Sequence, residues 1–307
     1  MKGIVSSLIV LLIFLTVLSL SSAFSTKFLE YKDIINRNSI LDRVYYKFIS
    51  LEHSTIRILQ EEASFGGINV SITEDSFNTV TFQENLPRRN SSNFQEDLDR
   101  FERFAEFKIN ETNLAVDLNF TELKCLPIII LPYGISYTHF PDGSTCQQVP
   151  AQTQVVIDPG ASWSYVNSYD FVFRPNGNIA TAYIVPWEGP GCGKGNLQLS
   201  MTVIGNDVTK GPYVTTTDVA KMCRFNFDAI SCPGGSGYIH IIHNQNSRED
   251  DKSLILIEVQ PNCNLDSTIS LNLDDMPGKI RVTFPPQTIK VKETLYQIEK
   301  NDTIYVY

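Results

Sequence analysis

The chain has 307 residues, of which 42% are apolar and 19% are charged, and its net charge at neutral pH is −9. This length and apolar content are enough for one large or two small cores, which excludes wholesale disorder. The acidic balance argues against nucleic acid and against an anionic membrane surface as binding partners.

The first element is an apolar run from Ile4 to Phe24 without a charged residue, and Lys2 is the only basic side chain before it. About 20 apolar residues span a bilayer, so the run is long enough for a membrane helix. The alternative is a secretory signal that ends in Ser21-Ser22-Ala23 and is cleaved between Ala23 and Phe24. The apolar part of such a signal is usually about 7–15 residues, and this run is at the long end or beyond; the amphipathic pattern that follows it favours a retained helix.

Residues 25–65 continue as an amphipathic pattern, and residues 4–65 contain neither glycine nor proline. The pattern therefore predicts one helix about 90 Å long that ends at Gly66-Gly67. Ser39-Ile40-Leu41-Asp42 has the form of a capping box, so the alternative is a hinge at residues 36–39 and a second helix from Ser39. The apolar stripe alone leaves open whether it packs on the following domain or on partner helices; its members are Phe28, Tyr31, Ile34, Leu41, Val44, Tyr45, Phe48, Leu51, Ile58 and Leu59.

The N-terminal sequence resembles archaeal type IV pilins and pilin-like surface proteins, which carry class III signal peptides. The resemblance rests on Met1-Lys2-Gly3, followed at once by an uncharged apolar helix, an amphipathic extension and a β-rich region, and it covers roughly residues 1–65. It implies cleavage between Gly3 and Ile4, so that the mature chain begins with the helix. It also implies a membrane anchor and a homo-oligomer or filament assembled through that helix.

Six cysteines, an even number, follow the export-type N-terminus and predict disulfides. They are Cys125, Cys146, Cys192, Cys223, Cys232 and Cys263. The sequence does not select among the 15 possible pairings, but we expect Cys223 to pair with Cys232 across a turn at residues 228–230, and Cys125 with Cys146. A zinc site is the weaker alternative, because no two cysteines have the C-x₂₋₄-C spacing.

Five Asn-x-Ser/Thr sequons are typical of an exported glycoprotein and predict surface positions. Their asparagines are Asn69, Asn90, Asn110, Asn119 and Asn301.

Residues 66–112 form a small segment with a predicted hairpin and a predicted helix. Residues 68–72 and 80–82 alternate apolar and polar side chains on either side of Glu74-Asp75-Ser76, which indicates two strands and a turn. Phe94, Leu98, Phe101 and Phe104 recur at helical spacing, so we expect an amphipathic helix to about residue 107 with its phenylalanines in the core.

Residues 113–307 are rich in short strand patterns separated by turns, which indicates a sandwich or barrel. Residues 303–307 also have a strand pattern. Residues 216–222 fit a short helix or a turn. The strands are expected at 114–120, 128–139, 153–157, 169–173, 179–185, 197–204, 238–243, 254–259, 268–273, 279–284 and 288–291.

Two local patterns invite a chemical interpretation. The glycine-rich segment Gly189–Gly195 has Gly195 where a phosphate-binding loop needs Ser or Thr, so it predicts a turn between strands, stapled by Cys192. His240 and His243 are three residues apart on a predicted strand, so they lie on opposite faces and cannot ligate one metal together. We identify no catalytic residue, metal ligand or cofactor site.

The sequence thus predicts an α+β protein: a leader or apolar segment (1–24), an amphipathic helix (25–65), a small segment (66–112) and a sandwich-like head (113–307). We expect a non-enzymatic exported surface protein, either a pilin-like filament subunit or a membrane-anchored adhesin, with a carbohydrate or other cell-surface ligand as a candidate partner. The alternatives are a secreted β-sandwich binding protein and an extracellular carbohydrate-active enzyme, which would need two carboxylates in one cleft.

Overall fold

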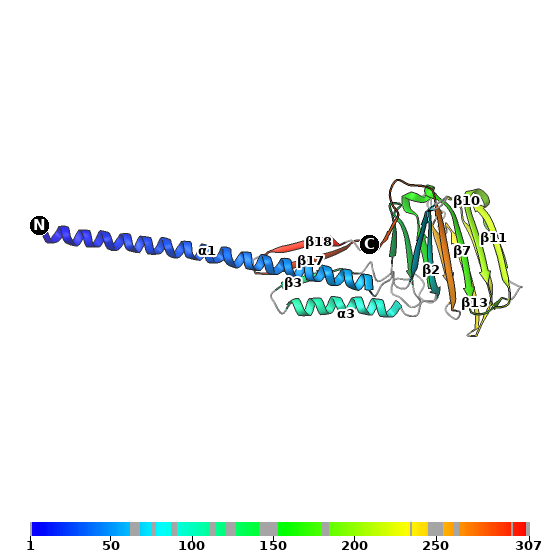
Figure 1. The fold of residues 1–307 in the computed structure, drawn as a ribbon, viewed down its shortest axis with the longest axis horizontal. Coiled ribbons are helices and arrows are strands. Elements are labelled where there is room, and N and C mark those ends of the chain that lie inside the picture. Colours follow the sequence, from blue (N-terminus) through cyan, green and yellow to red (C-terminus); the bar gives the residue numbers. More distant parts are fainter. Residues whose placement is uncertain are drawn as a thin grey trace. The chain divides into compact units, whose positions relative to one another are not determined.

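The fold is α+β, as predicted, with a long N-terminal helix followed by a strand-rich region (Figure 1). In this computed structural model the described residues are 2–61, 68–74, 78–86, 91–110, 114–120, 127–140, 153–179, 184–233, 235–244, 254–260, 264–295 and 297–304. The chain divides into two compact units. The helical unit comprises Met1–Glu52, Ala105–Asp117 and Ile289–Asp302, and the sandwich unit comprises His53–Phe104, Leu118–Thr288 and Thr303–Tyr307.

Helix α1 (Lys2–Glu61) is continuous over 60 residues, which confirms the single helix up to Glu61 and makes the alternative, a hinge at residues 36–39, wrong. Ser39 and Asp42 lie inside the helix, where no helix start exists for them to cap. With no glycine or proline in this stretch, nothing interrupts the ladder of backbone hydrogen bonds. Gly66-Gly67, where we expected the helix to end, lies outside the described residues.

The helical unit contains a small sheet in the order β18 (Glu299–Ile304), β17 (Gln287–Glu293) and β3 (Leu114–Leu118). Helix α1 runs beside β17 and β18 (Figure 1). Val44, Phe48 and Leu51 of α1 are buried, and Lys300 on β18 places its ammonium 5.1 Å from the centre of the Phe48 ring. Three members of the predicted apolar stripe are therefore core, whereas Tyr45 beside them is 52% exposed.

Helix α3 (Ser91–Asn110) confirms the helix that we expected at residues 94–107. Leu98 is buried and Phe101 stacks on Phe120, but Phe104 is 60% exposed. The expectation that all its phenylalanines belong to the core is therefore wrong.

The sandwich unit has two main sheets. The first has the order β1-β2-β15-β7-β10-β11, and all its described neighbours pair antiparallel except β7 and β10, which are parallel. Its strands are β1 (Asn69–Glu74), β2 (Asn78–Leu86), β15 (Leu265–Leu273), β7 (Val166–Pro175), β10 (Cys192–Ile204) and β11 (Thr209–Thr217). The β1–β2 pair confirms the predicted hairpin.

The second sheet has the order β16-β4-β5-β6-β14-β13-β12-β8, and β9 also pairs with β12. Its first five strands are β16 (Arg281–Thr283), β4 (Pro127–Leu131), β5 (Ile135–Phe140), β6 (Thr153–Asp158) and β14 (Ile255–Val259). The others are β13 (Gly235–His243), β12 (Cys223–Cys232), β8 (Asn178–Ile179) and β9 (Ile184–Glu188). A 3-10 helix, η2 (Gly160–Tyr165), connects β6 to β7.

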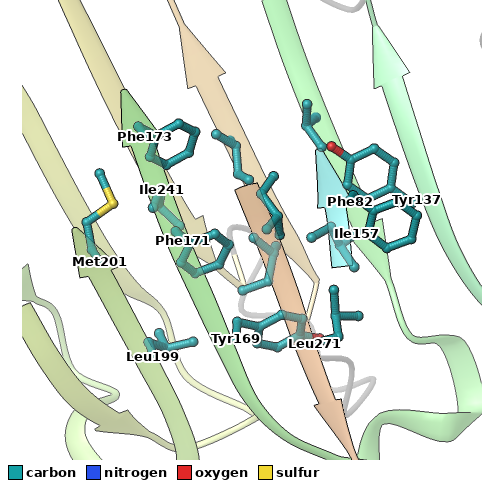
Figure 2. Packing of buried hydrophobic residues seen from close by; sticks show 14 of the residues in the cluster. Phe82, Tyr137, Ile157, Tyr169, Phe171, Phe173, Leu199, Met201, Ile241 and Leu271 are labelled. Atoms are coloured by element: carbon teal, nitrogen blue, oxygen red, sulfur yellow. The ribbon is translucent and has the colours of Figure 1, made fainter. Parts of the chain in front are cut away.

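Alternating apolar side chains of the two sheets form one core (Figure 2). On β7, Tyr169, Phe171 and Phe173 point inward at every second position. Phe82 of the first sheet stacks on Tyr137 of the second, with ring centres 4.0 Å apart. A side chain at alternate positions of a strand faces one side of the sheet, so each sheet buries one face and leaves the other free for polar groups.

Candidate functional site

The most unusual surface of the molecule is the N-terminal part of α1. The described residues of the chain include one helix that is long and apolar enough to cross a membrane. An 18-residue window of this helix has a mean hydropathy of 1.6, and the rest of the chain does not bury it. A signal sequence near an N-terminus has the same properties, so length and composition alone do not separate a retained helix from a cleaved one.

The exposed apolar surface of α1 continues past Phe24, where the predicted span ends. Phe24, Phe28, Tyr31 and Ile35 are 75%, 66%, 69% and 55% exposed. At 3.6 residues per turn these four side chains fall within about 60° of one another around the helix. We call them the exposed stripe.

Four charged residues of the same turns form two ion pairs, and a fifth, Lys32, is exposed about 70° around the helix from the centre of the exposed stripe. Lys27 Nζ lies 2.7 Å from Glu30 Oε2, and Arg37 Nε lies 3.0 Å from Asp33 Oδ2. Val44, Phe48 and Leu51, which the helical unit buries, lie on roughly the opposite side of the helix from the exposed stripe. The helix therefore presents one apolar face to its own unit and leaves a second one uncovered.

The disulfide pairing of Cys223 differs from our expectation. Cys192 at the start of β10 is joined to Cys223 at the start of β12, which links the two main sheets. The predicted Cys223–Cys232 pair is wrong, because residues 223–232 form a single strand. The ends of a strand of ten residues lie roughly 30 Å apart, whereas a disulfide needs Cα atoms about 4.4–6.8 Å apart. Cys232 is disulfide-bonded too, and Cys125, Cys146 and Cys263 lie outside the described residues.

The glycine-rich segment is a turn only at residues 189–191, because Cys192, which staples it, already begins β10, and residues 192–195 are strand and not turn as predicted. A Cβ atom at Gly191 would lie 2.6 Å from the carbonyl oxygen of Lys221, and one at Gly189 would lie 2.6 Å from that of Met222. Both glycines thus allow this turn to pack against the connection between β11 and β12. Gly189 also has a φ of +131°, which side-chain-bearing residues rarely adopt.

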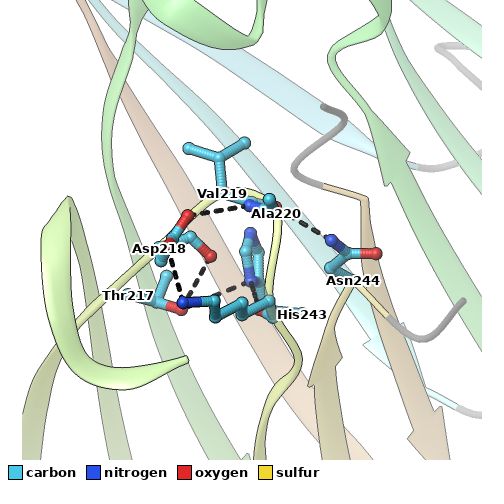
Figure 3. Close-up of polar contacts among 7 residues, drawn as sticks. Thr217, Asp218, Val219, Ala220, His243 and Asn244 are labelled. Carbon is cyan, nitrogen blue, oxygen red and sulfur yellow. Dashed lines mark hydrogen bonds and ion pairs between the residues drawn. The ribbon is translucent and has the colours of Figure 1, made fainter. Parts of the chain in front are cut away.

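The connection between β11 and β12 closes over His243 (Figure 3). Asn244 Nδ2 donates to the carbonyl oxygen of Val219 at 2.9 Å, and the Asp218 carboxylate accepts from the Ala220 N–H at 3.1 Å. The Ala220 N–H, with Lys221 nearby, lowers the pKa of Asp218. Burial lowers the pKa of His243 to about 4, so this imidazole is neutral at pH 7.

His240 lies on the opposite face of β13 from His243, as predicted. It is partly exposed, and its Nε2 lies 2.6 Å from Asp228 Oδ1. Tyr238 stacks on its ring. Among the described residues no group of three or more His, Cys, Asp or Glu side chains is placed to hold a metal ion.

A buried polar cluster that the sequence analysis missed joins the two main sheets. Glu84 on β2 accepts a short hydrogen bond from the Tyr137 hydroxyl. His139 Nδ1 lies 2.8 Å from Glu84 Oε2, but the two groups are not aligned for a hydrogen bond. All three side chains are fully or almost fully buried. The signal for Glu84 was present, because it follows Val80 and Phe82 at alternate, inward-facing positions of β2.

The remaining predicted site residues are placed as follows. Asn69, Asn119 and Asn301 are exposed; Asn110 is the last residue of α3, and Asn90 lies outside the described residues. Gly3, Ile4, Ala23 and Phe24, the predicted processing positions, all lie within α1. Glycosylation and processing at these residues stay predictions.

Comparisons of the chain with protein-family models, with curated proteins and with solved structures found no match. The geometry therefore defines the class only as an α+β protein with a candidate membrane-spanning helix and a disulfide-linked sandwich.

Proposed function

We propose that this chain is a non-enzymatic surface protein of the pilin-like type, held in a membrane by α1 and assembled with other copies through the exposed stripe. The observation that carries the proposal is the apolar surface of α1, which continues beyond a bilayer-length segment and is uncovered within the chain. Contiguous apolar surface of this extent marks a membrane or protein contact.

The charge pattern supports a helical partner for the exposed stripe. Lys27 is paired with Glu30 and Asp33 with Arg37, so among the described residues of these turns Lys32 is the charge beside the stripe that an acidic side chain of a second helix would pair with. Aromatic and branched side chains at steps of four, three and four residues are the pattern by which helices pack together. Export is supported by the Cys192–Cys223 disulfide, since such bonds persist in oxidising compartments.

Cross-linking of the chain in its native membrane tests the assembly. A glutamate in place of Phe28 or Ile35 puts a charge on the exposed stripe. We expect Phe28→Glu and Ile35→Glu to reduce cross-linked oligomers at least tenfold, because an unpaired charge in a closed apolar contact is costly.

Asn36→Glu is the matched control. Asn36 is an exposed neutral residue of the same helix, roughly 100° around the axis from the stripe. The Asn36→Glu substitution therefore adds the same charge to the helix but outside the stripe. It should leave the oligomers intact. Equal assembly of Phe28→Glu, Ile35→Glu and the unmodified chain would overturn this function, provided the Cys192–Cys223 bond shows that each variant is folded.

A further inference from the structure

A groove in the sandwich unit is lined by no residue of α1. It has a volume of about 520 Å³, within the range of about 300–1,000 Å³ for small-molecule sites. It lies where β2, β15, β7 and β10 meet at one end of the first sheet, and its polar lining consists of Asn85, Arg174, Asn176, Asn206, Asn264 and Asp266.

The polar side chains of the groove are free to bind a ligand. The four asparagine side chains are exposed, and none makes a hydrogen bond in the part of the chain that the structure describes. Each side-chain amide offers two donors and one acceptor. Asp266 has no side-chain partner among the described residues, and Arg174 makes only a long contact of 3.5 Å with Thr268 Oγ1.

The backbone around the groove is tied together. Asn176 N–H donates to the carbonyl oxygen of Asn264 at 2.9 Å, and Asn206 N–H donates to that of Gly177 at 3.0 Å. Asp266 pairs in register with Asn85 on one side and Arg174 on the other. The lining residues therefore come from fixed positions on strands and bonded turns, so little ordering of the backbone opposes binding.

The charges of the groove favour a neutral ligand. Arg174 and Asp266 occupy neighbouring positions and balance each other, so an isolated anion would meet the carboxylate and an isolated cation would meet the guanidinium. A planar guanidinium, a carboxylate and several amides together supply donors and acceptors for vicinal hydroxyl groups.

The apolar lining argues against a peptide. It consists of Ile204, Pro175 and Leu265, of which the last two are buried, and it contains no aromatic residue. Peptide contacts usually depend on a pocket that takes an apolar or aromatic anchor.

We propose that this groove binds a neutral oligosaccharide through Asn85, Asp266 and the neighbouring amides. Without an aromatic platform a single site binds weakly, and several copies on one surface would raise the overall affinity. Binding by the groove does not depend on assembly through α1, so either proposal can fail while the other stands.

The test is saturation-transfer difference NMR on the full-length chain in detergent micelles. The probes are lactose, maltose, mannobiose and chitobiose. We expect at least one disaccharide to receive saturation, and Asn85→Ala and Asp266→Asn each to weaken its apparent affinity at least tenfold.

Gln83→Ala is the matched control, because Gln83 is an exposed amide two residues from Asn85 on the same face of β2 and does not line the groove. It should bind the disaccharide as the unmodified chain does. Absence of transfer to all four disaccharides would overturn the proposal, and so would equal transfer in the groove variants and in Gln83→Ala. Binding of calcium or inorganic phosphate in place of the sugars would identify an ion site and contradict it too.

Discussion

At the scale of single residues, the polar groups buried between the two sheets have the largest predicted effects. Glu84, Tyr137 and His139 connect β2 to β5 inside an otherwise apolar core. A buried charge is tolerated when it is paired, but removal of one partner leaves the other without compensation. No local sequence pattern reveals such a cluster, because Glu84 is more than 50 residues from Tyr137 and His139 and meets them only when the sheets pack.

Glu84→Leu should therefore destabilise the sandwich unit by roughly 3 kcal/mol, since it leaves the Tyr137 hydroxyl buried without its acceptor and His139 buried without the carboxylate beside it. Glu84→Leu combined with Tyr137→Phe and His139→Leu should lose less stability than Glu84→Leu alone, because no polar group is then left unpaired. Urea unfolding of the full chain in micelles measures both. A combined variant less stable than the single one would contradict this account of the cluster.

His243 predicts an acid sensitivity. Burial lowers its pKa in the folded chain to about 4, against 6.5 when it is solvated. Between these values the unfolded chain binds more protons, so stability falls as the pH falls from about 6.5 to 4, by roughly 3 kcal/mol at most. His243→Gln should flatten the dependence of the unfolding free energy on pH in this window. An unchanged slope in that variant would mean that other groups cause the acid sensitivity.

At the scale of elements, the helices and most strands could be predicted, and the errors have local causes. Strand β12 contains an irregularity in register between Phe227 and Ile230, with Asp228 and Ala229 between them, and this interruption was interpreted as a turn between two cysteines. Strand β11 contains Gly211-Pro212 and few apolar residues, so it gave no strand signal; residues 218–221 after it form the turn that was one of our two alternatives. The groove combines four separate segments, so the sequence gave no indication of it.

The disulfide between β10 and β12 predicts a stability change at this scale. It joins residues separated by 31 positions, and closing a loop of that length stabilises a fold by roughly 3 to 4 kcal/mol in the chain-entropy model. The double substitution of Cys192 and Cys223 by serine should lower the midpoint of urea unfolding accordingly, whereas Cys223→Ser alone leaves a reactive thiol at Cys192. A double variant as stable as the unmodified chain under oxidising conditions would contradict a structural role for this bond.

At the scale of the whole molecule, α1 supplies a membrane-length segment and a second, uncovered apolar stripe, and the sandwich unit contains the groove that we propose as a sugar site. An acidic chain with a net charge of −9 resists nonspecific association of its exposed surface, so association is left to the apolar helix. The sequence predicted the helix and a single apolar stripe because helical periodicity is local, but it did not separate the buried residues Val44, Phe48 and Leu51 from the exposed stripe on the other side of the helix.

The mature N-terminus, determined by mass spectrometry of the protein from its native host, tests the central claim most directly. The account predicts a chain that begins at Ile4 and keeps the whole apolar segment of α1. A chain that begins at Phe24 would have lost that segment, and it would contradict both the membrane anchor and the pilin-like assembly.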